Sequence, residues 1–360
     1  MTVRVFDTFP FDGELDLLEH RLRETYDLVD AFVIVEAAQT YRGTAKPFTF
    51  EENKSRFGWA ADKIRHVKLA SLGPASATPR ERAAAQRNSV LLALRDAAPE
   101  DLVLLLDVDE MPSPALIERL RRDGLARPRR LAMTRHYGFA DTLGPRSPCC
   151  PTGVDPFAAA TPPLRPGRWG ALTADWYGHS GAAAPVAAVR EAGAFALRFG
   201  LADAAPLPDA GRHYSSVDPA AALARKLGRV FHAEYDGPRE TSPEHLGRCR
   251  RYWVHHRGWW LAERPQGELP NDIARLLAAS PVLAAGPPPA RLIRRLVRSW
   301  AWLRLSPAMP GRLVAVIDRR FETLLPLLLP PLLLCEGVRA AAAMVLGMLP
   351  RRVVSPLARH

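Results

Sequence analysis

The stretch Leu102–Pro112, with the sequence LVLLLDVDEMP, decides the fold class. Its run of five aliphatic residues is typical of a strand buried on both faces, at the centre of a covered parallel sheet. Three carboxylates follow within four residues, at the carboxyl end of that strand, where open α/β sheets bind ligands. Asp107 and Asp109 share one face of an extended chain, and such oxygen ligands suit Mn²⁺ or Mg²⁺ bridging to phosphate. The alternative is an acidic turn whose charges are only solvated.

Strand and helix patterns alternate on both sides of this stretch, which favours a doubly wound, mostly parallel α/β sheet. Helices are expected over Glu14–Tyr26, Pro79–Ala97 and Pro114–Asp123, the last capped by Ser113 and ended by Gly124. A loop rich in Pro, Gly and Ala is expected over Thr142–Pro166, crossing the site. The other expected strands are Val3–Phe6, Ala31–Val35, Ile64–Leu69, Leu131–Thr134, Trp169–Leu172 and Ala194–Arg198.

The net charge of +11 is concentrated at the C-terminal end. Residues 290–360 carry twelve arginines against three acidic residues, so the preceding residues are close to neutral. No nucleic-acid-binding motif accompanies the basic segment, and we expect no nucleic-acid partner. Four cysteines without metal-ligand spacing favour a reducing compartment, and the first residues, already strand-like, predict neither a signal peptide nor an anchor.

The C-terminal segment is predicted to be an appendage, with a first domain over residues 1–280 and a Pro-linked, Arg-rich part over 281–360. Residues 291–303 separate arginines from apolar residues on a helical wheel, which predicts a basic amphipathic helix suited to an anionic membrane surface. Packing of its apolar face on the protein is the alternative. Residues 324–349 are apolar but contain prolines that we expect to break a helix, so membrane-spanning, interfacial and protein-packed placements stay open. We therefore expect peripheral membrane contact through residues 291–349 and a cytoplasmic location on the inner face of the membrane.

Several short motifs occur in an order that resembles glycosyltransferase family 17, from residue 3 to about residue 240. They are Phe6–Phe11, Glu14–Glu19 with Arg21-Leu22, Val29–Glu36, Thr40–Gly43 with Lys46-Pro47, Gln86–Asn88, Asp107–Glu110 with Pro112, Gly211–Ser215, Lys226-Leu227 and His232–Tyr235. The resemblance implies a GT-A-like fold and inverting transfer of N-acetylglucosamine from UDP-N-acetylglucosamine. Where the family usually has a tryptophan, this chain has Arg212, which exchanges an aromatic wall for a cation and puts the acceptor in question.

Site residues follow from the strand ends and from the resemblance. Asp107 and Asp109 are the expected ligands of a divalent Mn²⁺ or Mg²⁺, and a histidine, His213 or His232, would complete the shell. A base must take the proton of the acceptor hydroxyl, for which Glu234 comes first and Glu110 second. Contacts with the nucleotide sugar are expected from Asp7, Thr8, Glu36, Gln86, Arg87, Asn88 and Asp107, although the three helix residues also fit a solvated surface.

The resulting hypothesis is a metal-dependent glycosyltransferase acting on a glycan or a lipid-linked saccharide. A second hypothesis keeps the fold but changes the donor sugar, or makes the reaction nucleotidyl transfer. A third is a membrane-associated protein that binds saccharides without catalysis. Release of UDP from a panel of UDP-sugars separates the first hypothesis from the third.

Overall fold

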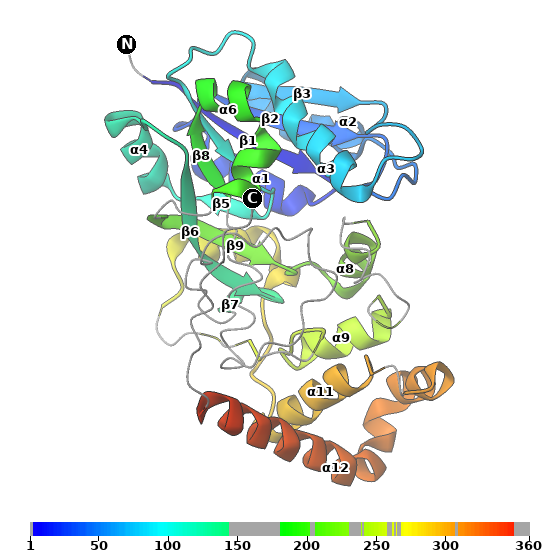
Figure 1. Cartoon of the computed structure of the whole chain (residues 1–360). Helices are drawn as coiled ribbons and strands as arrows, with labels where there is room; N and C mark the ends of the chain where they lie inside the picture. The colour runs from blue at the N-terminus through cyan, green and yellow to red at the C-terminus, as the bar shows by residue number, and fades with distance from the viewer. Residues whose placement is uncertain are drawn as a thin grey trace.

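The computed structural model describes residues 3–143, 181–201, 206–229, 239, 241–257, 261, 262, 264, 268–306 and 309–348 (Figure 1). Over these residues nine strands join in one sheet, in the order β3-β2-β1-β4-β8-β6-β9-β5, with β7 paired to β6. Their bounds are β1 Val5–Phe11, β2 Ala31–Ala37, β3 Ile64–Leu69, β4 Leu102–Leu105, β5 Glu110–Pro112, β6 Arg129–Tyr137, β7 Phe139–Leu143, β8 Ala182–Pro185 and β9 Leu207–Ser215.

The sheet is mixed, so the expectation of a mostly parallel sheet holds only for its N-terminal part. Strands β3, β2, β1 and β4 are parallel neighbours. Strand β8 then pairs antiparallel with both β4 and β6, and β9 is parallel to β6 but antiparallel to β5. The fold class α/β is confirmed in this coarser form.

Helices cover both faces of the parallel part, because alternate residues of its strands are apolar on each side. On one face, Phe9, Phe32 and Leu104 pack with leucines of α1 and α4. On the other face, Val33 and Val103 pack with residues of α6, α7 and the 3₁₀ helix η2. The bounds are α1 Leu15–Thr25, α2 Thr49–Asn53, η1 Lys54–Lys63, α3 Pro79–Asn88, η2 Ser89–Ala93, α4 Pro114–Asp123, α6 Val186–Ala192, α7 Ala194–Gly200, α8 Ala220–Leu227, α9 Pro243–Arg251, α10 Asn271–Ala279, η4 Pro281–Leu283, α11 Arg291–Leu303 and α12 Gly311–Met348.

Two local predictions for the first 280 residues were wrong. The expected strand Ala194–Arg198 is helix α7, since a short apolar run does not distinguish a strand from a buried helix. Gly193, with φ of +83°, turns the chain between α6 and α7, and Asn88 accepts a hydrogen bond from the N–H of Phe195. The long helix expected over Pro79–Ala97 divides into α3 and η2. The expected strand Trp169–Leu172, and the loop after Leu143, lie outside the described residues.

The C-terminal helices form a separate apolar cluster with α9, at the lower end of Figure 1. Helix α11 is amphipathic as expected, but Leu296, Val297 and Trp300 on its apolar face are buried against α9 and α12. Beneath them Asp318 accepts hydrogen bonds from Arg248 and Arg304. Packing on the protein, the alternative stated above, therefore describes the apolar face of α11.

Helix α12 continues through Pro326, Pro330 and Pro331, where a break was expected. Each interior proline removes one helical hydrogen bond and crowds the carbonyl of the residue four positions before it, at a cost of about 3 kcal/mol, but the chain stays helical through all three. The departure from helical geometry occurs instead at Arg320, with φ of −122° and ψ of 23°. Within the described part of the chain, no helix combines the length and apolar character needed to cross a bilayer.

Candidate active site

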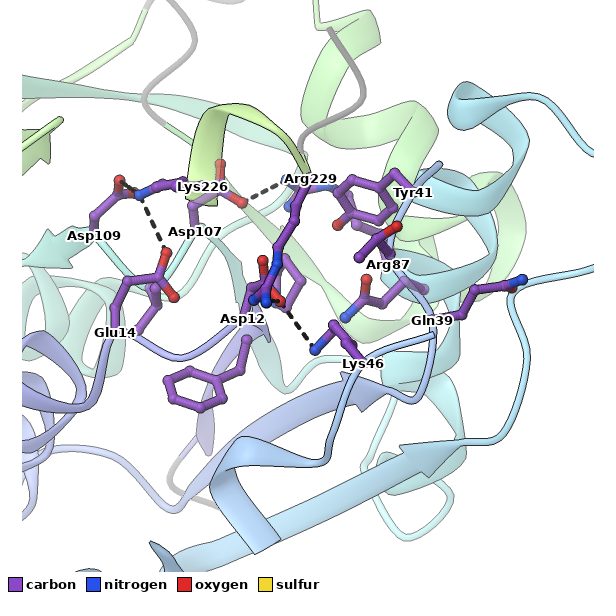
Figure 2. Close-up of a pocket in the computed structure, with 15 residues that line it drawn as sticks. Asp12, Glu14, Gln39, Tyr41, Lys46, Arg87, Asp107, Asp109, Lys226 and Arg229 are labelled. Carbon is purple, nitrogen blue, oxygen red and sulfur yellow. Dashed lines mark hydrogen bonds and ion pairs between the residues drawn. The ribbon is translucent and has the colours of Figure 1, made fainter. Parts of the chain in front are cut away.

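A cleft lies beyond the carboxyl ends of the parallel strands β1, β2 and β4, where the sequence pattern placed a ligand site (Figure 2). Three kinds of segment line it: the loops after these strands, helix α3, and the end of helix α8. The lining residues are Pro10, Phe11, Asp12, Glu14, Gln39, Thr40, Tyr41, Lys46, Gln86, Arg87, Asp107, Val108, Asp109, Lys226 and Arg229. Four carboxylates and four cationic side chains thus face the same space.

Asp107 lies between two arginines. Its Oδ1 accepts a hydrogen bond from Arg87 Nη2 at 2.5 Å, and its Oδ2 accepts one from Arg198 Nη2 at 2.7 Å. Burial opposes ionisation of Asp107, but the two guanidinium groups outweigh it and lower the pKa of the carboxyl below its ordinary value. Asp107 is therefore a fixed anion on the wall of the cleft.

Asp109 belongs to a second charged cluster, centred on the ammonium of Lys226. Lys226 Nζ is 2.9 Å from Asp109 Oδ2, 3.1 Å from Glu14 Oε1 and 3.9 Å from Asp218 Oδ2. Burial opposes the charge of Lys226, but these carboxylates outweigh it and hold the lysine pKa well above its usual value. Burial raises the pKa of Glu14, and Glu14 Oε2 is buried without a hydrogen-bond partner among the described residues.

The side chain of Arg21 fixes the backbone of the acidic turn, residues 107–110. This fully buried side chain donates to both oxygens of Asp7, at 2.7 and 2.5 Å. Its Nη1 also donates to the carbonyl oxygens of Asp107, Val108 and Glu110, at 2.8, 3.2 and 2.7 Å. One guanidinium therefore ties strand β1 and helix α1 to the backbone of the acidic turn.

Of the residues predicted to contact the donor, the structure brings Gln86, Arg87 and Asp107 to the cleft. Gln86 also donates to the carbonyl oxygen of Val35, at 2.8 Å. The remaining four do not line the cleft, because their side chains form hydrogen bonds or ion pairs inside the fold. Asp7 pairs with Arg21, the hydroxyl of Thr8 donates to Leu104 O, Glu36 accepts from the N–H of Phe50, and Asn88 accepts from Phe195.

The two predicted bases are differently placed. Glu110 is buried behind the turn, where Arg198 donates to both of its oxygens, at 2.8 and 3.0 Å. Its Oε2 also accepts from the N–H of Asp107. The structure thus separates Glu110 from the cleft. Glu234, like the predicted ligand His232, lies outside the described residues.

A divalent ion fits part of the predicted ligand set. Asp109 Oδ1 and His213 Nε2 are 3.9 Å apart, close enough for one ion to bind both. Burial lowers the pKa of His213, which favours the neutral imidazole that binds metals, and its Nδ1 has no hydrogen-bond partner among the described residues. Both oxygens of Asp107 are engaged by arginines. In the described ranges, no group of three or more His, Cys, Asp or Glu side chains is placed to hold a metal.

Sequence reasoning did not assign roles to several charged residues of the site. Asp12 and Glu14 follow β1 immediately, so the strand-end argument applied to Asp107 also points to them. Arg198 fell in a segment predicted as a strand. Lys226 lies at the end of α8 and Arg229 in the turn after it, more than a hundred residues after the acidic turn. Lys226-Leu227 is one of the motifs of the resemblance, but no local pattern assigned it a role at the acidic turn.

Comparison with known proteins confirms the resemblance over the N-terminal part of the chain. Residues 1–140 match glycosyltransferase family 17. Curated relatives named beta-1,4-mannosyl-glycoprotein 4-beta-N-acetylglucosaminyltransferase, from Rattus norvegicus, Homo sapiens and Mus musculus, are each 30% identical over 146 residues. That region is 38% of this chain and 27% of each relative, so the chain spans about a quarter of their length. No solved structure matches the chain significantly.

Proposed function

We propose that this chain is a glycosyltransferase that moves a sugar from a nucleotide-sugar donor to a saccharide hydroxyl. One observation carries the proposal: Arg87, Asp107 and Asp109, all within the residues that match glycosyltransferase family 17, line one cleft at the strand ends. The names of the relatives support transfer of N-acetylglucosamine, and the proposed donor is UDP-N-acetylglucosamine, as the resemblance to glycosyltransferase family 17 implies. The acceptor is a glycan or a lipid-linked saccharide, and a GT-A-like arrangement of residues 1–280 remains part of the proposal.

Divalent Mn²⁺ or Mg²⁺ is the proposed cofactor, with Asp109 and His213 as ligands and Asp107 and His232 as further candidates. When bound, such an ion neutralises charge that develops on a departing diphosphate. Arginine side chains of the fold already hold Asp107 and the turn that carries Asp109 in position. Arg87 and Arg198 fix Asp107, and Arg21 fixes the backbone of the turn on which Asp109 is carried.

Inversion requires a base that takes the proton of the acceptor hydroxyl. Glu234 remains the proposed base. Glu14 is a second candidate, because it lines the cleft and offers a buried oxygen without a hydrogen-bond partner among the described residues. A Glu14→Gln variant that keeps the wild-type kcat would remove Glu14 from consideration.

We also propose that residues 281–360 attach the enzyme to the inner face of the cytoplasmic membrane, now through α12. Leu327 and Leu334 are 76% and 71% exposed, and their spacing of seven residues puts both on one face of the helix. Leu313 and Val316 are also exposed, next to Arg312 and Arg319. Exposed apolar residues on both sides of Arg320, the first pair beside arginines, suit an anionic lipid surface.

The decisive experiment is release of UDP from a panel of UDP-sugars by the full chain, with and without Mn²⁺. The proposal expects Mn²⁺-stimulated release of UDP, fastest with UDP-N-acetylglucosamine. Release from another nucleotide sugar would favour the second hypothesis, a different donor. Saccharide binding without release of nucleotide from any donor would favour a non-catalytic saccharide-binding protein.

A further inference from the structure

We infer that Lys226 and Arg229 form a clamp for the diphosphate of the donor, which rests on the function proposed above. Both residues come from the end of α8 and the turn after it, well beyond the residues that match glycosyltransferase family 17. The N–H of Arg229 donates to Lys226 O at 3.0 Å, so the helical turn continues and the two residues lie one turn apart. Both side chains line the cleft (Figure 2).

Among the described residues, the side-chain partners of these two cations are carboxylates. Lys226 lies among Asp109, Glu14 and Asp218, and Arg229 Nη1 is 3.6 Å from Asp12 Oδ1. Unlike the arginines that fix Asp107, the side chains of Lys226 and Arg229 keep 25% and 33% of their surface exposed. They are therefore positive groups that an anion entering the cleft can reach.

Two further cations face the clamp from the other wall. Lys46 Nζ is 3.0 Å from Asp12 Oδ1, and Arg87 holds Asp107. Each of these side chains is largely buried, so its position is fixed by the fold. A diphosphate between the walls would meet positive charge on both sides. Its oxygens accept charge-assisted hydrogen bonds, with a guanidinium suited to bind two of them.

Movement of Lys226 from Asp109 to a phosphate oxygen would have a consequence for the metal ligand. Asp109 Oδ2 now accepts a hydrogen bond from Lys226 Nζ. If the ammonium turns to the diphosphate, both oxygens of Asp109 become available to a divalent ion. The clamp thus links capture of the donor to completion of the metal site.

The competing explanation is that these ion pairs only attach α8 to the N-terminal part of the chain. Binding of UDP and of uridine to the full chain, in EDTA, distinguishes the two, because uridine lacks the diphosphate. For Lys226→Met and for Arg229→Met we expect affinity for UDP to fall about tenfold each, with affinity for uridine unchanged. Lys226→Arg should restore most of the loss.

Arg225→Met is the matched control, because Arg225 is exposed on the same helix and does not line the cleft. It should leave both affinities unchanged. Equal losses for UDP and uridine, or a loss for UDP of less than twofold in both clamp variants, would overturn the clamp. Should Lys226→Met fail to fold, the more exposed Arg229→Met alone decides.

The outcomes also separate the clamp from the proposed function. Wild-type protein that binds UDP independently of Lys226 and Arg229 would refute the clamp and leave sugar transfer in place. Protein that binds a different nucleoside diphosphate through both residues would support the clamp and correct the donor. Failure to bind any nucleoside diphosphate in EDTA would refute the clamp, and failure to bind one in the presence of Mn²⁺ as well would also refute the proposed function.

Discussion

The buried pair Asp7–Arg21 gives the most direct test of how the site is built. Neutralising Asp7 by Asp7→Asn leaves the Arg21 guanidinium buried without its counter-charge, since both side chains are fully buried. Breaking such a pair from one side costs about 3–5 kcal/mol of unfolding free energy. The unfolding entropy is about 2.1 cal/mol/K per residue, so for 360 residues each kcal/mol lowers the thermal midpoint by about 1.3 °C, and the midpoint should fall by roughly 4–7 °C.

Urea unfolding followed by circular dichroism measures this loss, and UDP binding is measured in parallel below the new midpoint. The double variant Asp7→Leu, Arg21→Met should regain part of the stability, because replacing both partners by apolar groups leaves no isolated charge. It should not regain activity, since the carbonyl groups of Asp107, Val108 and Glu110 then lose their common donor.

The opposite result would refute this reasoning. If Asp7→Asn kept the wild-type unfolding free energy but lost UDP affinity, Asp7 would contact the donor, as its position in the sequence first suggested. Arg23→Met is a suitable control on the same helix, because Arg23 is an exposed residue paired with Glu19. Surface pairs of this kind contribute about 0–1 kcal/mol.

Three further predictions concern the metal, acid and membrane. Asp109→Ala should abolish sugar transfer and Mn²⁺ binding while the circular dichroism spectrum stays native; a wild-type rate would exclude Asp109 as a ligand. Burial lowers the pKa of several histidines around β6 and α9 in the folded state. As the pH falls below about 6.5, these histidines therefore become protonated in the unfolded state before they do in the folded state. The free energy of unfolding should then decrease by about 1.4 kcal/mol per pH unit for each histidine. These are His136 and His256, both lowered to about 3, together with His245 and His255. Unfolding free energies that stay constant from pH 6.5 to 4.5 would contradict this. Leu327→Glu with Leu334→Glu should reduce sedimentation with anionic vesicles, whereas Leu92→Glu, at another exposed leucine, should not; equal binding by all three proteins would exclude the α12 surface.

The sequence predicted the central strands of the parallel part well, because these strands are buried on both faces. Ala31–Val35 and Leu102–Leu106 are apolar enough that no amphipathic helix competes with the strand pattern, whereas Ile64–Leu69 is a partly exposed edge strand with polar residues. The strand-end rule then placed Asp107 and Asp109 at the cleft.

The same rule failed for Asp7 and Glu36, and the reason is physical. A carboxylate within a buried strand must be paired, and its partner can come from anywhere in the fold. For Asp7 that partner is Arg21, on the following helix; for Glu36 it is the backbone N–H of Phe50. Neither contact produces a repeating pattern in the sequence. A carboxylate that stabilises the fold therefore cannot be distinguished in the sequence from one that binds a ligand.

The charges of the cleft lead to a final prediction. Its described lining balances four carboxylates, on Asp12, Glu14, Asp107 and Asp109, with four cations, on Lys46, Arg87, Lys226 and Arg229. A doubly charged diphosphate ester or a divalent cation alone would disturb this balance in a partly buried site, whereas the two together would not.

Each should therefore strengthen the binding of the other. Titration of Mn²⁺ followed by electron paramagnetic resonance should give an affinity at least about tenfold higher in the presence of UDP. Lys226→Met should raise the affinity for Mn²⁺ without UDP, because it removes one positive charge from Asp109, and should reduce the gain that UDP brings. Arg225→Met should match the wild type. Equal Mn²⁺ affinities with and without UDP would contradict this coupling. They would mean that the charge of the diphosphate is neutralised by protein cations alone, so that Lys226 and Arg229 take the place of the metal ion instead of freeing Asp109 to bind it.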